Sequence, residues 1–117
     1  LVGHCHCKMC QKFHGAAFST FGEVLLDNLI WHRGEEHLGH FRAENETVRS
    51  FCQHCGSSLL FESKYNRQQK TIEIALSAFD QLSSIDEIKP NAHIFTESQA
   101  PWCRFSDVLP KFEGYRK

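Results

Sequence analysis

The sequence has no long hydrophobic run, and this lack argues against a membrane-spanning helix. Its longest apolar runs, such as Val24-Leu25-Leu26, are far shorter than the roughly 20 residues that a helix needs to cross a bilayer. Nothing near Leu1 has the charged and then apolar pattern of a secretory signal peptide. We therefore expect a cytoplasmic protein with no membrane partner.

The sequence also lacks an excess of charge of either sign. Its 13 Lys and Arg residues are balanced by 14 Asp and Glu residues, and the formal net charge is -1. Phosphate-binding surfaces show clustered basic residues, whereas here the two signs are spread among each other. This distribution argues against a nucleic-acid partner.

Internal repeats, linkers and low-complexity tracts are absent as well. A chain of 117 residues fits one domain, and we expect residues 1–117 to form a single unit. With 41% hydrophobic residues and ten Phe it can bury a core, although a domain of this size is helped by a metal.

Alternation of apolar and polar residues predicts a mainly β fold with one or two short helices. Strands are expected over 15–21, 29–33, 38–42, 47–52, 58–62, 71–76 and 92–96. A helical turn is expected at 9–12 and a polar, exposed loop at 64–70. The most helix-permissive stretch, 80–87, is broken by Pro90.

Five of the six cysteines lie in two clusters. Cys5, Cys7 and Cys10 form a C-x-C-x-x-C array, and Cys52 and Cys55 form a C-x-x-C pair followed by Gly56. Soft thiolates at such short spacings converge on one ion because the residues between them make a tight loop. The pattern predicts a zinc protein.

Three arrangements of these cysteines compete. Disulfides are disfavoured, because the pairs are too close for ordinary structural bridges and no secretory signal is seen. A single closed zinc site would use four of the five clustered thiolates and leave one over. The third arrangement gives Cys5, Cys7 and Cys10 one zinc and assigns Cys52 and Cys55 to another.

The number of protein ligands separates a structural zinc from a reactive one. Zinc with three protein ligands keeps a fourth position for water or substrate, whereas a closed four-thiolate site does not react. A thiol at such a position would be held as thiolate, a ready nucleophile for a small carbonyl. The C-x-C-x-x-C array therefore favours substrate chemistry.

Each of the remaining candidate residues has a possible structural role as well as a functional one. Alternation turns His6 away from a metal that Cys5 and Cys7 face, so His4, His6 and His54 are expected behind the ligands or exposed. His14 and His93 line a substrate pocket or are buried and hydrogen-bonded. Cys103, which has no partner at ligand spacing, is expected to be a buried structural thiol. The other histidines, His32, His37 and His40, are expected on strand faces.

The two cysteine motifs resemble those of the glutathione-dependent formaldehyde-activating enzyme family, whose domain is shared with centromere protein V. The first motif reads His4-Cys5-His6-Cys7-Lys8-Met9-Cys10 followed by Gly15-Ala16, and the second reads Phe51-Cys52-Gln53-His54-Cys55-Gly56 followed by Leu59. Near the end, His93-Ile94-Phe95 and Ala100-Pro101-Trp102 resemble the family's closing segments. The resemblance extends over nearly the whole chain.

The resemblance implies a β-tent-like fold of small antiparallel sheets with two zinc sites. Cys5, Cys7 and Cys10 match the ligands of the family's open, catalytic zinc, and Cys52 and Cys55 match half of its structural zinc. The other half is a C-x-C pair upstream of the first motif, which this sequence does not contain, and the chain begins with Leu1 rather than Met. We therefore expect it to lack N-terminal strands.

The expected activity is that of a zinc-dependent carbon-sulfur lyase or synthase. It would join a thiol such as glutathione to formaldehyde or a related small aldehyde, through the open zinc on Cys5, Cys7 and Cys10. The alternatives are a zinc-containing module that binds glutathione or a protein without turnover, and a purely structural zinc domain. The sequence identifies no general acid and no oligomeric state.

Overall fold

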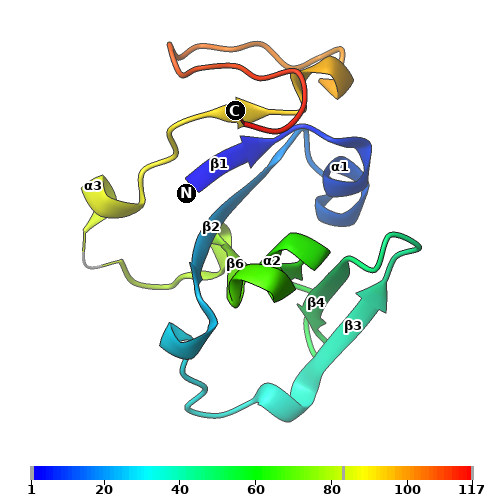
Figure 1. Ribbon diagram of the computed structural model, residues 1–117, viewed down its shortest axis with the longest axis vertical. Coiled ribbons are helices and arrows are strands. Elements are labelled where there is room, and N and C mark those ends of the chain that lie inside the picture. The colour runs from blue at the N-terminus through cyan, green and yellow to red at the C-terminus, as the bar shows by residue number, and fades with distance from the viewer. Residues whose placement is uncertain (1, 83, 117) are drawn as a thin grey trace. The chain divides into compact units, whose positions relative to one another are not determined.

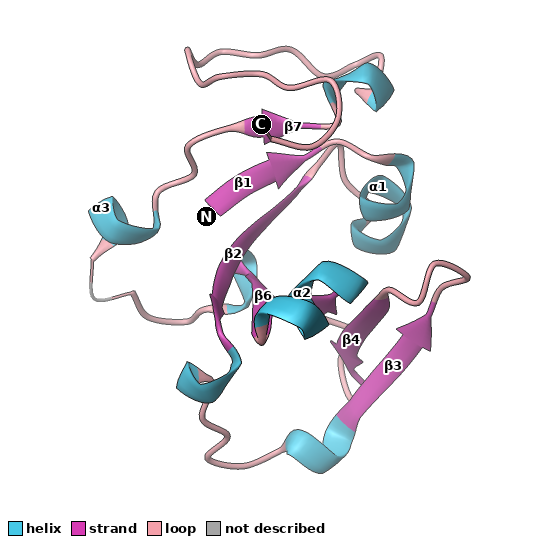
Figure 2. Ribbon diagram, in the orientation of Figure 1, coloured by secondary structure: helices cyan, strands magenta, loops and turns pink. Residues whose placement is uncertain are grey.

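The computed structural model describes residues 2–82 and 84–116. They divide into two compact units, Leu1–Gly22 with Gln81–Lys117 and Glu23–Asp80. The described residues contain seven strands and only short helices, which confirms the prediction of a mainly β fold (Figure 2). A single domain over residues 1–117 stays a prediction.

The first unit is built on β1 (Val2–Cys5), which lies between two other strands (Figure 1). One neighbour is β2 (Ser19–Leu25), which pairs with β1 in antiparallel orientation and continues into the second unit. The other is β7 (His93–Ile94), which pairs in parallel, with His4 opposite His93. None of the strands predicted from the sequence covers β1, so the residues before the first cysteine are more regular than expected.

The segment after β7 folds back and runs beside β7, on the edge that does not pair with β1. The His93 N–H donates to the Pro110 carbonyl at 2.9 Å, and the Phe112 N–H donates to the His93 carbonyl at 2.9 Å. Between these points the chain makes a 3-10 turn, η4 (Thr96–Ser98). β7 is therefore enclosed by backbone on both edges, which holds its side chains in fixed positions.

Two helices belong to this unit. α1 (Lys8–His14) contains the predicted helical turn and ends at Gly15, whose φ of 62° lies in the left-handed region that glycine adopts without strain. α3 (Ile85–Ile88) is a single turn that overlaps the end of the stretch 80–87, which was predicted to permit a helix. The helix that matters for the site is α1, because it begins directly after Cys7.

The second unit contains four strands that pair in chain order. They are β3 (Leu38–Arg42), β4 (Val48–Cys52), β5 (Ser58–Glu62) and β6 (Thr71–Ala75). Each neighbouring pair is antiparallel, and a register shift at Ser50/Phe51 interrupts the pairing of β4 with β5. All four strands were predicted from the sequence.

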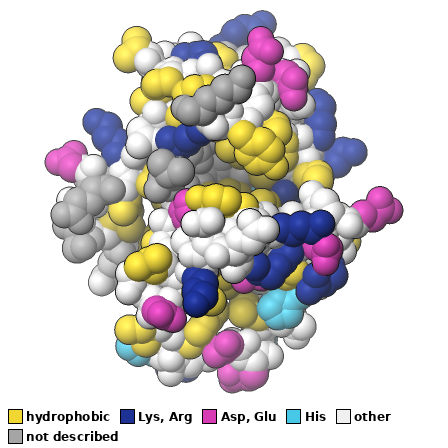
Figure 3. All heavy atoms as spheres, in the orientation of Figure 1, with side chains coloured by type: hydrophobic (Ala, Val, Ile, Leu, Met, Phe, Trp, Pro, Cys, Tyr) yellow, Lys and Arg dark blue, Asp and Glu magenta, His cyan; other side chains and the backbone are white. Residues whose placement is uncertain are grey.

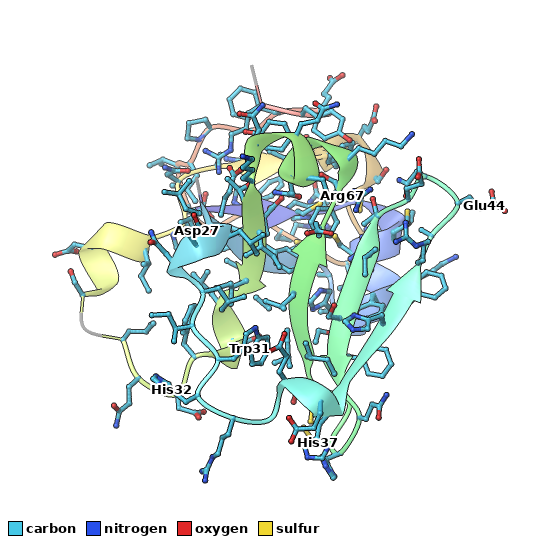
Figure 4. The ribbon with its side chains drawn as sticks, turned by 60° about the horizontal axis from the view of Figure 1, so that its bottom comes forward. Asp27, Trp31, His32, His37, Glu44 and Arg67 are labelled. Atoms are coloured by element: carbon cyan, nitrogen blue, oxygen red, sulfur yellow. The ribbon has the colours of Figure 1, made fainter. Side chains whose placement is uncertain are left out.

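Two sequence predictions for this unit are wrong. The polar stretch predicted as a loop is α2 (Lys64–Gln69), and the strand predicted over 29–33 is an irregular connection. That connection runs from η1 (Leu26–Asn28) to η2 (Glu35–His37), and Figure 4 labels Trp31 and His32 on it. Ile30 is 71% exposed there, so the apolar residues of the connection lack the burial that a strand would give them. The remaining 3-10 turn, η3 (Leu76–Ala78), follows β6.

α2 is stabilised by a pair of reciprocal hydrogen bonds at its N-terminus. The Ser63 side chain accepts a hydrogen bond from the Asn66 N–H, and the Asn66 side chain accepts one from the Ser63 N–H at 2.8 Å. Asn66 also donates to the Thr71 hydroxyl at 3.0 Å and is fully buried. This reciprocal capping box satisfies donors that would otherwise be unpaired at the helix end.

The exposed surface carries charges of both signs. On the face shown in Figure 3, Lys and Arg side chains are interspersed with Asp and Glu side chains. Among the helices that the structure describes, none has the length and apolar character required to cross a bilayer.

Replacing Asn66 with Ala should destabilise the second unit. The variant loses the buried bonds to Ser63 and Thr71, so we expect the free energy of unfolding to fall by about 2 kcal/mol. Urea unfolding followed by circular dichroism measures the change. The matched control is Gln68→Ala on the same helix, at an exposed position, with an expected change within about 0.5 kcal/mol. Equal effects from both variants would contradict the capping argument.

Candidate metal centre

Three thiols converge where β1 gives way to α1. Cys5 is the last residue of β1, Cys7 is the N-cap of α1, and Cys10 lies in its first turn. Their Sγ atoms all lie within 4.8 Å of one another. Tetrahedral Zn²⁺ with Zn–S bonds of about 2.3 Å sets its sulfurs about 3.8 Å apart, so this spacing and the soft donors fit a zinc ion.

The backbone turn that gathers the thiols is held by its own hydrogen bonds. The Cys10 N–H donates to the Cys7 Sγ at 3.3 Å, and the Gln11 N–H donates to the Cys7 carbonyl at 3.0 Å. Cys10 is only 2% exposed, whereas Cys5 and Cys7 are half-buried. The cluster thus has a buried side and a more open side.

The crowding of the thiols affects their protonation. Hydrogen bonds with Cys10 and then Cys7, followed by burial, raise the pKa of the Cys5 thiol well above its ordinary range. In the absence of a cation, ionising the Cys5 thiol is therefore unfavourable. A bound metal ion reverses this preference, because its positive charge stabilises the thiolates.

His6 lies between two of the thiols in sequence but does not join them. Among the residues that the structure describes, the cluster contains only the three cysteines, and His6 is fully buried. Its Nε2 lies 2.8 Å from the Nδ1 of His93. Burial, then the neighbouring His93 and His4, lower the pKa of His6 to about 4, so it is neutral at pH 7.

His93 continues this contact towards the surface. Its Nε2 lies 3.0 and 3.2 Å from the two carboxylate oxygens of Asp107, and its side chain is 3% exposed compared with 39% for Asp107. The hydrogen bond with His93, followed by one from the Leu109 N–H, lowers the pKa of the Asp107 carboxyl. The side chains of Asp107, His93 and His6 therefore form one continuous chain, which we call the Asp–His–His chain.

His4 stands beside this chain. Its ring centroid is 4.9 Å from that of His93, and its Nδ1 lies 2.8 Å from the Thr20 hydroxyl. Burial, followed by the nearby His93, lowers the pKa of His4. Phe18 and Phe105 pack against these rings and complete an aromatic cluster.

Cys52 ends β4, and Cys55 lies in the turn between β4 and β5. The Gly56 N–H donates to the Cys52 carbonyl at 2.7 Å, and the Cys52 N–H donates to the Ser57 carbonyl at 2.9 Å. Hydrogen bonds from Ser57, and then from the Cys52 thiol, lower the pKa of the exposed Cys55 thiol. The described residues bring no third metal-binding side chain to these two.

The other candidate residues mostly have the structural or surface positions predicted for them, with some differences. His54 is exposed and its ring centroid is 4.3 Å from that of His37, which ends η2 rather than lying on a strand (Figure 4). His40 is on β3 as predicted, and His32 is on the exposed connection instead of a strand. Cys103 is buried at 9% exposure.

The sequence did not reveal the role of Asp107. It lies beyond the last strand predicted from the sequence, and it meets His93 across 14 residues of chain. The only available signal was the position of His6 between two cysteines, since alternation turns its side chain to the opposite side of the strand.

Comparison with known proteins gives one family. The family model described as glutathione-dependent formaldehyde-activating enzyme matches residues 1–98. A search of curated proteins found no match. The matched range covers most of the 117 residues and includes both cysteine motifs. The chain therefore belongs to the glutathione-dependent formaldehyde-activating enzyme family.

Proposed function

We propose that the protein is a zinc-dependent carbon-sulfur lyase that interconverts a thiol and a small aldehyde with their S-hydroxymethyl adduct. The thiol of the family name is glutathione and the aldehyde is formaldehyde. The observation that carries the proposal is the convergence of three thiols without a fourth metal-binding side chain among the described residues. Three protein ligands leave one tetrahedral position for an incoming group.

The chemistry needs few groups. In the forward direction the sulfur of the thiol forms a bond to the aldehyde carbon, and the thiol proton ends on the aldehyde oxygen. A divalent ion, when bound, supplies positive charge that favours the ionised form of the substrate sulfur. The protein's part is to hold that ion through Cys5, Cys7 and Cys10 and to keep one side of the cluster accessible.

The burial of the three cysteines agrees with a cluster that holds an ion and keeps one side accessible. Cys10, in the first turn of α1, is buried, whereas Cys5 and Cys7 retain exposure through which a small substrate can approach. The Asp–His–His chain occupies the nitrogens of His93 and the Nε2 of His6. These atoms hold one another rather than a substrate.

We also propose Cys52 and Cys55 as two ligands of a second metal site. Their turn has the tight backbone of a zinc knuckle, and the lowered pKa of Cys55 favours the thiolate that a metal binds. Tetrahedral coordination needs two further ligands besides these cysteines.

Metal analysis of cysteine variants tests both sites. Cys10→Ser should lower the bound zinc by about one ion per chain, because it removes one of the three ligands of the first site. Cys55→Ser should lower the content independently, while Cys103→Ala, at a buried thiol outside both clusters, should leave it unchanged. Zinc is measured by mass spectrometry after purification without chelator, with folding checked by circular dichroism. Wild-type zinc content in Cys10→Ser would rule out the first site.

An activity measurement tests the reaction itself. Glutathione and formaldehyde combine without a catalyst, so the rate of adduct formation must be compared with buffer alone, for example by exchange NMR. The wild type and Cys103→Ala should exceed the uncatalysed rate, and Cys10→Ser should fall to it, because the open metal position is lost. If the wild type only matches the buffer, the lyase is excluded, and calorimetry with glutathione then identifies or excludes a binding module.

A further inference from the structure

The Asp–His–His chain links the metal cluster to a surface carboxylate through two buried rings. His6 is fully buried and His93 is 2% exposed, so neither ring exchanges its hydrogen bonds with water. Asp107 is the part of the chain that solvent reaches. Buried polar atoms carry a desolvation cost unless they are hydrogen-bonded, and the chain supplies such partners to both nitrogens of His93 and to the Nε2 of His6.

The direction of these hydrogen bonds follows from the chemistry of the end group. An ionised carboxylate only accepts, so the Nε2 of His93 carries the proton that faces Asp107. When the His93 ring is neutral its Nδ1 is an acceptor, and the Nε2 of His6, which lies 2.8 Å away, donates to it. Asp107 thus selects the tautomer of His93, and His93 in turn selects that of His6.

The backbone of His6 is held as firmly as its ring. The His6 N–H donates to the Ile94 carbonyl at 3.0 Å, and the His6 carbonyl accepts from the Gln11 side chain at 2.6 Å. The same Gln11 amide donates to the Ser98 carbonyl at 2.9 Å. The residue between Cys5 and Cys7 is therefore fixed by its N–H, its carbonyl and its ring.

This fixation bears directly on the thiols. Cys5 and Cys7 are the two neighbours of His6, so any rotation of the His6 backbone would move their sulfurs in different directions. A ligand loop that is already ordered loses less conformational entropy when it binds an ion than a flexible loop does. Groups that orient metal ligands from behind commonly change metal affinity by 10-fold to 100-fold when they are removed.

We propose that Asp107, acting through His93 and His6, is a positioning residue that preorganises the Cys5-Cys7-Cys10 loop for its metal ion. The inference rests on the metal site of the proposed function but not on the lyase activity. Asp107 touches neither the thiols nor a substrate in this scheme. Its effect is transmitted by hydrogen bonds to the residue between two ligands.

Cobalt binding by the full chain tests the inference without an activity assay. Co²⁺ bound to thiolates gives intense charge-transfer absorption and d–d bands that report the coordination geometry. The metal-free protein is titrated with Co²⁺ in the presence of a competing chelator, and Cys10→Ser supplies the baseline because it lacks a ligand. Asp107→Ala should bind Co²⁺ about 10-fold more weakly than the wild type and show altered d–d bands.

Two further variants separate positioning from general stability. Asp107→Asn keeps an oxygen that accepts from His93, so it should restore most of the affinity and the wild-type bands. Glu113→Ala removes an exposed acid from the same C-terminal segment and should behave as the wild type. Thermal unfolding of each metal-free variant shows whether lower affinity merely follows lower stability.

Each outcome decides a separate point. Wild-type affinity and bands in Asp107→Ala would overturn the inference while leaving the metal site intact. An affinity loss in Asp107→Ala that Asp107→Asn does not restore, or that Glu113→Ala shares, would also overturn it. If Asp107→Ala does not fold, the comparison of Asp107→Asn with His93→Gln decides, since only the second should weaken binding. A wild-type protein without the Cys10-dependent cobalt bands would refute the proposed metal site itself.

Discussion

The parallel pairing of β1 with β7 is the constraint on which the candidate metal centre depends. Its backbone hydrogen bonds include those from Asn91 to Val2, from His4 to Ala92 and from His6 to Ile94, at 2.9 to 3.0 Å. A strand of two residues contributes little by itself, but β7 is enclosed by backbone on both edges. This enclosure puts His93 against His4 and His6 and brings its ring nitrogen to His6.

The change from strand to helix between Cys5, where β1 ends, and Lys8, where α1 begins, explains how three thiols meet at one point. Cys5 still follows the strand, whereas Cys7 and Cys10 follow the first turn of α1. Residues three apart at a helix start lie on the same side, which brings Cys10 back towards Cys7. Two different local geometries therefore supply ligands from two directions, as a tetrahedral ion requires.

The part of this centre that is local in sequence could be predicted, and the part that is not local could not. The spacing of Cys5, Cys7 and Cys10 is short enough to determine their convergence, and the structure shows their sulfurs together. His6 and His93 meet across 87 residues, and a single sequence holds no periodicity that pairs such distant positions. Alternation gave only the side of the strand from which the His6 ring leaves.

The same distinction explains the errors in secondary structure. In the strands β3, β4 and β5 apolar and polar residues alternate, and short turns join the strands. Residues close in sequence therefore largely determine their pairing. α2 consists of polar residues and begins with a Ser63–Asn66 cap rather than the more familiar cap with Glu or Gln. The apolar residues 29–33 resemble a strand, but a strand also needs a partner edge, which sequence alone does not supply.

The arrangement of charge gives the Asp–His–His chain a physical rationale. Three thiolates outweigh the charge of a divalent ion, so a carboxylate placed directly against them would be repelled and would weaken the site. Two imidazole rings separate Asp107 from the residue between the cysteines, and Asp107 keeps partial exposure to solvent that screens its charge. The carboxylate can therefore fix the orientation of His93 and His6 while its electrostatic repulsion with the thiolates stays small. If the carboxylate acts only through hydrogen bonds, its removal changes the positions of the sulfurs and leaves the charge around them nearly the same. The metal ion then responds to the altered geometry of its ligands.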